Sequence, residues 1–243
     1  MEISRILKLF LFFINFIGIL GKNSGSCGNN VNWEYDPSSG ELTISGEGPM
    51  KDYNERESIP WYTMKDDIKS VEIKNGVTTV GQFSFYNCSS ITNVIIPNTV
   101  VSINSGSFLK CKSLTSITIP DFVTLIGKEA FGSCSSLTSV IIGESVNTIE
   151  SYAFEFCDNI ETFVYKGHKS PTCRSNGLFS DRNFDIDVPD DYEGDTFCEE
   201  ILKLDKDFPF VIIIIIIIIV IIVLCVGIYG ILKCIKRCKK DKN

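Results

Sequence analysis

The sequence predicts a repeat solenoid with a parallel β-sheet, followed by one C-terminal transmembrane helix. Three observations predict this fold class: a pattern that recurs every 23 residues, short alternating β-branched runs within each copy, and an uncharged segment at 211–232. One such copy cannot bury its apolar side alone, so neighbouring copies must stack around a common core. The expected segments are a signal peptide at 1–26, an N-terminal cap at 27–67, repeats at 68–165, a C-terminal cap at 166–200, a juxtamembrane stalk at 201–210, a transmembrane helix at 211–232 and a cytoplasmic tail at 233–243.

The repeat is visible as columns of similar residues spaced by 23 positions. A phenylalanine column and a cysteine column recur in four copies: Phe85, Phe108, Phe131 and Phe154, with Cys88, Cys111, Cys134 and Cys157. Aliphatic columns keep the same register, including Val71, Val94, Ile117 and Val140, and Ile73, Ile96, Ile119 and Ile142. Columns that hold register over several copies indicate stacked coils whose equivalent residues lie above one another.

Each copy contains a Val-x-Ile segment that alternates and is β-branched, which predicts a short strand. Pro97 and Pro120 follow two of these segments and end them, because proline has no N–H for the ladder. Gly143 takes the same place in the next copy. Stacking the coils then places equivalent strands side by side in one parallel sheet.

The regions on either side of the repeats are expected to cap the solenoid. Residues 27–67 are rich in turn residues and contain one clear strand, Leu42-Thr-Ile-Ser. Three aromatic side chains there can cover the first coil: Trp33, Trp61 and Tyr62. Residues 166–200 contain apolar positions like those of a shortened sixth copy without its cysteine: Leu178, Phe179, Phe184, Ile186 and Val188.

The repeat resembles the BspA-like subgroup of leucine-rich repeats. The segment SLTSITIPDFVTLIGKEAF at 113–131 lies close to the consensus of that family, except that Phe122 stands where serine is usual. The N-terminal cap is similar through Cys27-Gly28, Trp33, LTISGEG at 42–48, Met50, Asp52 and Pro60-Trp61-Tyr62. The PTC at 171–173 and the DYEGDTFC ending at Cys198 resemble the C-terminal region of the family.

This resemblance covers roughly residues 27–200 and implies both fold and function. It implies a right-handed leucine-rich repeat solenoid whose parallel sheet lies on the concave side, with short turns or helical turns elsewhere. It further implies adhesion, since members bind matrix proteins, host cells or other microbes. The family shares no residue-level binding motif, so no binding residue is transferred from it.

Residues 211–232 are uncharged and include an unbroken isoleucine run at 212–219. A helix of this length spans roughly 33 Å, enough for a hydrocarbon core of about 30 Å. Lipid favours a helix because the backbone must satisfy its own hydrogen bonds. Six basic residues follow at 233–243, so the positive-inside rule puts the tail in the cytoplasm and the repeats outside.

The N-terminus agrees with this orientation. Arg5 and Lys8 precede an apolar stretch at 9–20, and small residues follow at 21–26, as in a secretory signal peptide. We therefore expect a single-pass plasma-membrane protein; an uncleaved first segment is the alternative. The basic tail is expected to attract anionic membrane lipid.

The cysteines divide by compartment. The column cysteines are expected to be buried free thiols, because in-register neighbours lie farther apart than a disulfide allows. Cys173 and Cys198 are the best disulfide candidates, since small caps benefit from a covalent link. This leaves Cys27 unpaired or joined to a column cysteine. Cys234 and Cys238, beside the membrane, are lipidation candidates, with plain reduced thiols as the alternative.

The composition argues against several functions. The chain has 30 acidic and 23 basic residues, a net charge of −7, which excludes the basic footprint of a nucleic-acid binder. Its one histidine, His168, lies in a Lys-Gly-His-Lys segment, and no catalytic, phosphate-binding or zinc motif is present. We therefore expect no catalytic residue, no metal and no cofactor. An acidic run at 181–195 leaves a weak calcium site as an alternative to a solvated face.

Period-two alternation selects the residues that face solvent on the concave sheet. The ligand-binding candidates are Thr92, Asn93, Ile95, Thr115, Ser116, Thr118, Thr138, Ser139, Ile141, Thr162 and Val164. They are rich in hydroxyl groups and uncharged, and Ile95, Ile141 and Val164 are expected to be exposed along one column. Exposed apolar residues on a sheet suggest a partner site, although threonine, serine and isoleucine are also simply good strand formers.

The sequence leaves three candidate functions for this chain. The first is a non-enzymatic cell-surface protein whose repeats bind an extracellular protein or cell-surface ligand. The second is a sorting or signalling receptor, which would need a co-receptor because the tail at 233–243 is short. The third, a membrane-tethered hydrolase, lacks a recognisable site.

Overall fold

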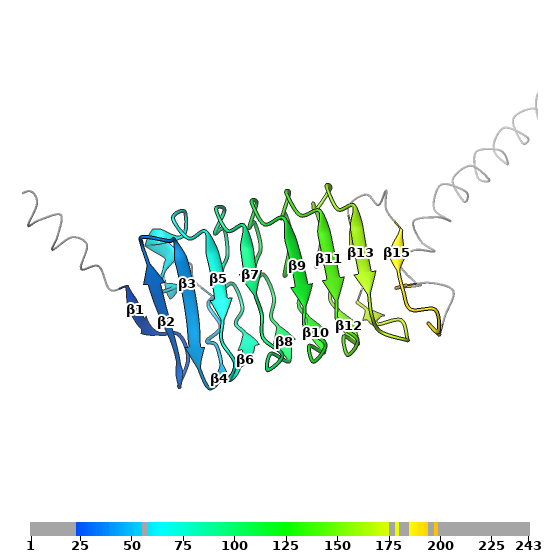
Figure 1. Cartoon of the computed structure of the whole chain (residues 1–243), viewed down its shortest axis with the longest axis horizontal. Coiled ribbons are helices and arrows are strands. Elements are labelled where there is room, and N and C mark those ends of the chain that lie inside the picture. The colour runs from blue at the N-terminus through cyan, green and yellow to red at the C-terminus, as the bar shows by residue number, and fades with distance from the viewer. Residues whose placement is uncertain (1–22, 55–57, 175–177, 180–184, 194–196, 199–243) are drawn as a thin grey trace, which may run out of the picture. The chain divides into compact units, whose positions relative to one another are not determined.

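The computed structural model describes residues 23–54, 58–174, 178–179, 185–193 and 197–198 (Figure 1). Most of the predicted signal peptide and all of the predicted stalk, transmembrane helix and tail lie outside these residues, as do Cys234 and Cys238. Within the described ranges, no helix is long and apolar enough to cross a bilayer. The segment at 211–232 therefore stays a prediction.

The predicted Val-x-Ile strands are confirmed, but they form two hydrogen-bonded sheets instead of the single sheet expected, one ending at 93–95 and the other beginning at 116–119. We call the two together the front sheet. Its repeat strands are β5 (Ser70–Ile73), β7 (Asn93–Ile95), β9 (Ser116–Ile119), β11 (Ser139–Ile142), β13 (Thr162–Tyr165) and β15 (Ile186–Asp187). Paired strands are parallel and shifted by the repeat length, so that Ser139 faces both Ser116 and Thr162. The 23-residue period of the sequence is thus the lateral register of the sheet.

A second parallel sheet, the back sheet, corrects the expectation of turns or helical turns outside the front strands. Its strands are β4 (Gly48–Pro49), β6 (Val77–Val80), β8 (Ser102–Ile103), β10 (Leu125–Ile126), β12 (Thr148–Ile149) and β14 (Thr172–Cys173), paired in this order. The buried Val-x-x-Ile positions, such as Val100 and Ile103, hold this side of each coil against the core. A two-residue strand is too short for sequence alternation to identify.

The phenylalanine column stacks through the middle of the solenoid. Ring centroids of Phe85 and Phe108 lie 5.0 Å apart, and those of Phe108 and Phe131 lie 5.3 Å apart, with nearly parallel planes. Trp61 extends the stack at 5.5 Å from Phe85, and Phe179 extends it at 6.1 Å from Phe154. Each of these phenylalanine rings makes the same stacking contact with the ring of the next coil. This explains why all four copies have phenylalanine at this position.

The N-terminal cap contains more strands than the single one expected. Strands β1 (Ser24–Ser26), β2 (Val31–Asp36) and β3 (Glu41–Gly46) are antiparallel, and β3 then pairs in parallel with β5. The 3-10 helix η2 (Tyr62–Met64) follows Trp61, which is fully buried and donates its indole N–H to the Ser84 carbonyl at 2.9 Å. Tyr62 is only half-buried, so Trp33 and Trp61 are the residues that close this end.

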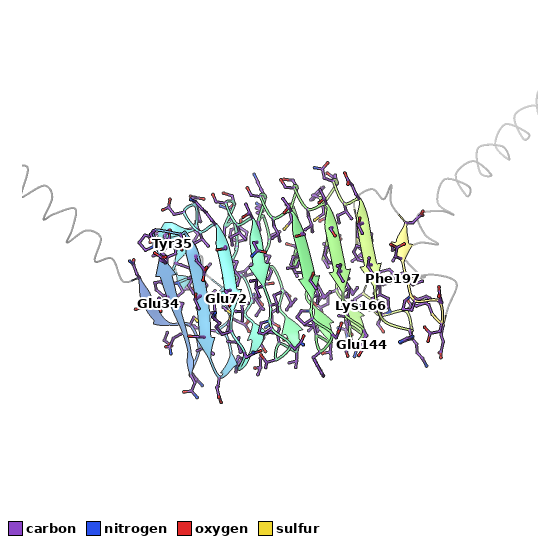
Figure 2. All side chains as sticks on the ribbon, in the orientation of Figure 1. Glu34, Tyr35, Glu72, Glu144, Lys166 and Phe197 are labelled. Carbon is purple, nitrogen blue, oxygen red and sulfur yellow. A yellow bond between two sulfur atoms is a disulfide. The ribbon has the colours of Figure 1, made fainter. Side chains whose placement is uncertain are left out.

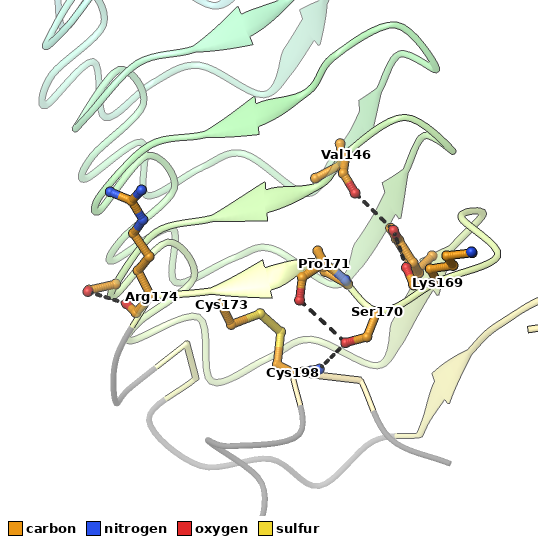
Figure 3. The surroundings of a disulfide bond; sticks show 9 residues. Val146, Lys169, Ser170, Pro171, Cys173, Arg174 and Cys198 are labelled. Atoms are coloured by element: carbon orange, nitrogen blue, oxygen red, sulfur yellow. Dashed lines mark hydrogen bonds between the residues drawn. A yellow bond between two sulfur atoms is a disulfide. The ribbon is translucent and has the colours of Figure 1, made fainter. Parts of the chain in front are cut away.

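The C-terminal cap is held differently. Cys173 and Cys198 form a disulfide with their Cα atoms 5.3 Å apart, and the Cys198 N–H donates to Ser170 Oγ at 2.9 Å (Figure 3). Strand β15 adds to β13 through Phe163 and Ile186, and Leu178 is buried, so a further, partial coil is present. Phe184 of the proposed shortened copy lies outside the described residues.

Candidate protein-binding face

The predicted binding residues all lie along the front sheet, outward of its core. Their inward neighbours Val94, Ile117, Val140 and Phe163 are buried, so alternation turns the predicted side chains within the strands to the other face, while Thr92, Thr115 and Thr138 each stand directly before a strand. The exposed members are Thr92, Asn93, Ile95, Thr115, Ser116, Thr118 and Thr162; the half-buried members are Thr138, Ser139, Ile141 and Val164.

Exposure along the apolar column is uneven. Ile95 is 51% exposed, whereas Ile141 and Val164 are half-buried against their neighbours. The expected exposure therefore holds fully only at Ile95. Ile141 pairs directly with both Thr118 and Val164, so these three outward side chains cover one another across the strands.

Two of the predicted threonines have structural partners. The Thr92 hydroxyl donates to the Lys69 carbonyl at 3.2 Å, and the Thr138 hydroxyl donates to the Thr115 carbonyl at 3.1 Å. Each bond joins one coil to the coil before it. These two hydroxyl groups hold neighbouring coils together. The side chains within the strands are therefore the ones left to contact a ligand.

Acidic residues stand at both ends of the Ile95 column. On the N-terminal side the register continues from Ile95 to Glu72, then to Thr43 and Glu34 (Figure 2). On the C-terminal side Val164 pairs with Asp187. The face is thus uncharged in its middle and acidic at its ends. Sequence reasoning missed Glu34, although the strict alternation of VNWEYD at 31–36 could have identified its strand.

An ion pair crosses the C-terminal ends of the front strands. Lys166, which follows β13, places Nζ 3.3 Å from Asp121 Oδ1, which follows β9. The intervening coil has Gly143 at the position of Lys166, so no side chain blocks this reach. Together with Ile95, Asn98 and Thr118, both residues line a surface hollow of about 380 Å³. Neither Asp121 nor Lys166 was identified from the sequence.

The column cysteines are unsuited to chemistry. Cys88, Cys111, Cys134 and Cys157 are buried free thiols, and so is Cys27. The thiols of Cys111 and Cys134 lie 3.3 Å from the carbonyl oxygens of Phe85 and Phe108. Burial raises the pKa of the Cys88 thiol to about 12 and that of Cys111 well above its ordinary value, so both remain protonated at neutral pH. A protonated thiol is not a nucleophile.

The remaining candidates for chemistry are solvent-exposed. His168 Nδ1 lies 2.8 Å from Asp191 Oδ1, and both side chains are more than half exposed. Within the residues that the structure describes, no group of three or more histidine, cysteine or acidic side chains is placed to hold a metal ion. Asp181 and Asp195 of the acidic run lie outside those residues.

Fold and face together define a leucine-rich repeat solenoid, a class whose members generally bind proteins and are not enzymes. The chain belongs to the BspA-type leucine-rich repeat family, because the family model "BspA type Leucine rich repeat region (6 copies)" matches residues 60–183. The match ends at residue 183, so it includes the first part of the predicted C-terminal cap at 166–200. A search of the curated proteins finds no match.

The chain is similar to several solved structures of bacterial leucine-rich repeat proteins. A leucine-rich repeat protein from Eubacterium ventriosum is 22% identical, with 70% of this chain and 44% of that chain covered and a TM-score of 0.44. A leucine-rich cell surface protein from Faecalibacterium prausnitzii is 21% identical, with 66% and 54% covered and a TM-score of 0.39. A leucine-rich repeat protein from T. pallidum is 16% identical, with 74% and 96% covered and a TM-score of 0.37.

Proposed function

We propose that this chain is a non-enzymatic, single-pass protein of the plasma membrane whose solenoid adheres to a protein on another surface. Membership of a family of repeat proteins supports the binding role. The predicted signal peptide at 1–26 and transmembrane helix at 211–232 support display outside the cell. The basic tail, with Cys234 and Cys238, would add contacts with membrane lipid.

The observation that carries this proposal is the uncharged middle of the front face. Ile95 is 51% exposed there, beside the exposed Thr118 and Ser116. A large apolar side chain left in water on a regular sheet is the feature expected of a surface that a partner covers. The strands hold these side chains in fixed positions, so little conformational entropy is lost when the partner binds.

The binding test uses the full-length chain displayed on cells that do not otherwise adhere. The triple variant Ile95→Ser, Ile141→Ser, Val164→Ser is expected to lose most of the attachment to host cells or to a matrix-coated surface. Val101→Ser is the matched control, because Val101 is 47% exposed but precedes β8 of the back sheet. Equal attachment by the triple variant and the parent chain, with both folded, would refute a role for the front face.

The topology test uses an epitope tag at each end of the chain. Antibody against a tag placed directly after Ser26 should stain intact cells, whereas a tag after Asn243 should need permeabilised cells. Staining of the N-terminal tag only after permeabilisation would contradict surface display. Adhesion and topology are thus tested separately.

A further inference from the structure

The front sheet is interrupted between β7 and β9. In the described part of the chain, strand β7 is the last strand of one hydrogen-bonded sheet, and β9 is the first strand of another. The interruption is local, because β8 and β10 of the same two coils pair normally through Ser102–Leu125 and Ile103–Ile126. The core is also continuous there, since Phe108 and Phe131 stack at 5.3 Å. The gap between these two coils therefore lies only in the front sheet, and the back sheet is continuous there.

Solvent reaches the core through this opening. The inward residues of β7 and its end, Val94 and Ile96, are 7% and 9% exposed, whereas the equivalent Ile117 and Ile119 are 2% and 0% exposed. Ile95 between them is the most exposed residue of the apolar column, at 51%. The hollow of about 380 Å³ has buried aliphatic walls and a polar margin. Val94, Ile96, Ile119 and Pro120 are its buried lining residues, and Asn98, Thr118, Asp121 and Lys166 are its more exposed polar ones.

The volume of this hollow lies at the lower end of the range for ligand pockets. Because the back sheet and the phenylalanine stack hold the two coils together, the opening cannot widen to admit a whole strand between β7 and β9. One side chain projecting from a segment that crosses the face fits within this volume and can contact the buried aliphatic walls. Such a segment would also lie against the facing strand edges, whose backbone groups are free of a ladder.

A further negative charge lies next to the hollow but not among its lining residues, on the coil whose Ser145 N–H donates to the Asp121 carbonyl at 3.2 Å. Asp121 is paired with Lys166, and Glu144 takes the position of Asp121 one coil further along. Glu144 is exposed and forms no salt bridge with any residue that the structure describes (Figure 2). Two carboxylates and one ammonium group leave a net charge of about −1, which favours a cationic neighbour for the bound side chain.

Building on the adhesion function proposed above, we propose that the hollow between β7 and β9 recognises one branched aliphatic side chain on an extended segment of a protein partner. A lysine or arginine beside that side chain faces Asp121 and Glu144. The aliphatic group fills the opening over Val94 and Ile96 and so removes exposed core surface from water. The cationic group adds selectivity for the partner rather than most of the affinity.

The experiment selects binders from a phage-displayed library of random short peptides against the immobilised full-length chain in detergent micelles. The expected consensus is a leucine, isoleucine or valine with lysine or arginine next to it or one residue removed. The variant Thr118→Trp fills the hollow from an exposed position and should weaken selected peptides by about 10-fold or more. Val101→Trp is the matched control, because Val101 is 47% exposed but precedes β8 of the back sheet and does not line the hollow, and it should leave binding unchanged.

A second variant separates the two parts of the site. Asp121→Asn with Glu144→Gln should keep the aliphatic consensus and lose the basic one, because Lys166 then dominates the rim. Absence of any enriched peptide, binding that survives Thr118→Trp, or a basic consensus that survives the double variant would overturn the proposal. Adhesion of cells that persists with Thr118→Trp but not with the triple front-face variant would refute the pocket alone. Peptide recognition without any cell adhesion would refute the adhesion function alone.

Discussion

The two ends of this solenoid are closed in different ways. At the N-terminal end, an antiparallel hairpin and two buried tryptophans cover the first coil, and the Trp33 and Trp61 rings meet edge to face at 5.9 Å. At the C-terminal end, the last strands are two residues long, and the Cys173–Cys198 disulfide ties the chain back. An exposed stack end can thus be closed by apolar burial, or by a covalent link where less surface is available.

The largest expected effect tests the N-terminal end. Trp61→Ala should lower the free energy of unfolding by about 3–5 kcal/mol, because it leaves a cavity over Phe85 and removes the indole hydrogen bond to Ser84. Urea denaturation followed by circular dichroism measures this. The neighbour Tyr62→Ala serves as the control and should cost much less, since Tyr62 is half-buried. A loss below about 1 kcal/mol for Trp61→Ala would show that burial does not close this end.

The next effect tests the C-terminal end. Replacing Cys173 and Cys198 by serine should lower stability by about 3.5 kcal/mol, as the chain-entropy relation gives for a link across 25 residues. Hydrogen exchange should rise mainly in β13 and β15, with little change in β2 and β3. Dithiothreitol should reproduce the change in the parent chain and have no effect on the double variant, because the other described cysteines are free thiols. Equal exchange at both ends would show that the caps are not independent.

Alkaline pH should weaken both ends through different groups. Burial raises the pKa of the Cys27 thiol from 9.0 to about 12, and burial first, then the nearby Tyr192, raises the pKa of Tyr165 from 10.0 to about 12. Below pH 9 both states keep these protons, so stability is unaffected. As pH rises towards 12, the unfolded chain ionises first and stability falls, on the order of 1 kcal/mol per group per pH unit.

Two variants test how much each end of the solenoid contributes to this loss of stability at alkaline pH. Cys27→Ala should reduce the loss that begins near pH 9 by the share of one thiol, because Cys88 and Cys111 contribute to the same loss, and Tyr165→Phe should reduce the loss that begins near pH 10. Unfolding free energies measured in urea across this pH range provide the readout. Curves that keep the parent slope in both variants would assign the loss to the column thiols instead.

The smallest effect is expected at one buried position of the repeat, which is serine in two copies and alanine in the two copies that follow. Ser84 is buried and donates its hydroxyl to the Gly81 carbonyl at 2.6 Å, whereas the buried Ser107 hydroxyl has no partner among the described residues. Ser84→Ala should cost about 1 kcal/mol, and Ser107→Ala should be neutral or slightly stabilising. Ala130 and Ala153 already occupy this column. Thermal melts compare the two variants, and an equal loss in both would contradict the assignment.

Much of the fold could be predicted because the repeat compares the chain with itself. The spacing of Cys88, Cys111, Cys134 and Cys157 already specifies which residues of neighbouring coils lie together, and the strands follow from Val-x-Ile alternation. The back sheet was missed because its strands are mostly two residues long. The hairpin of the N-terminal cap was missed because it occurs once, so no second copy marks its register.

The candidate face was predicted in position but not in detail. Alternation places the candidate residues within the strands outward, yet it cannot distinguish Ile95, which is exposed, from Ile141, which its neighbours half cover. It also cannot identify the Lys166–Asp121 pair, which joins positions two coils apart. Such contacts depend on side-chain reach across a twisted sheet rather than on spacing along the chain.

The sequence by itself determined the repeat length, the identity of the core columns, the front strands and the pairs of residues that meet from coil to coil. These properties are periodic, and every copy repeats the same local physical requirement. Only the tertiary structure decided where the front sheet opens, how far Val94 and Ile96 are reached by solvent, and which charges surround the hollow. The reason is that these features come from departures between otherwise equivalent coils, which become visible only when the coils are stacked in space.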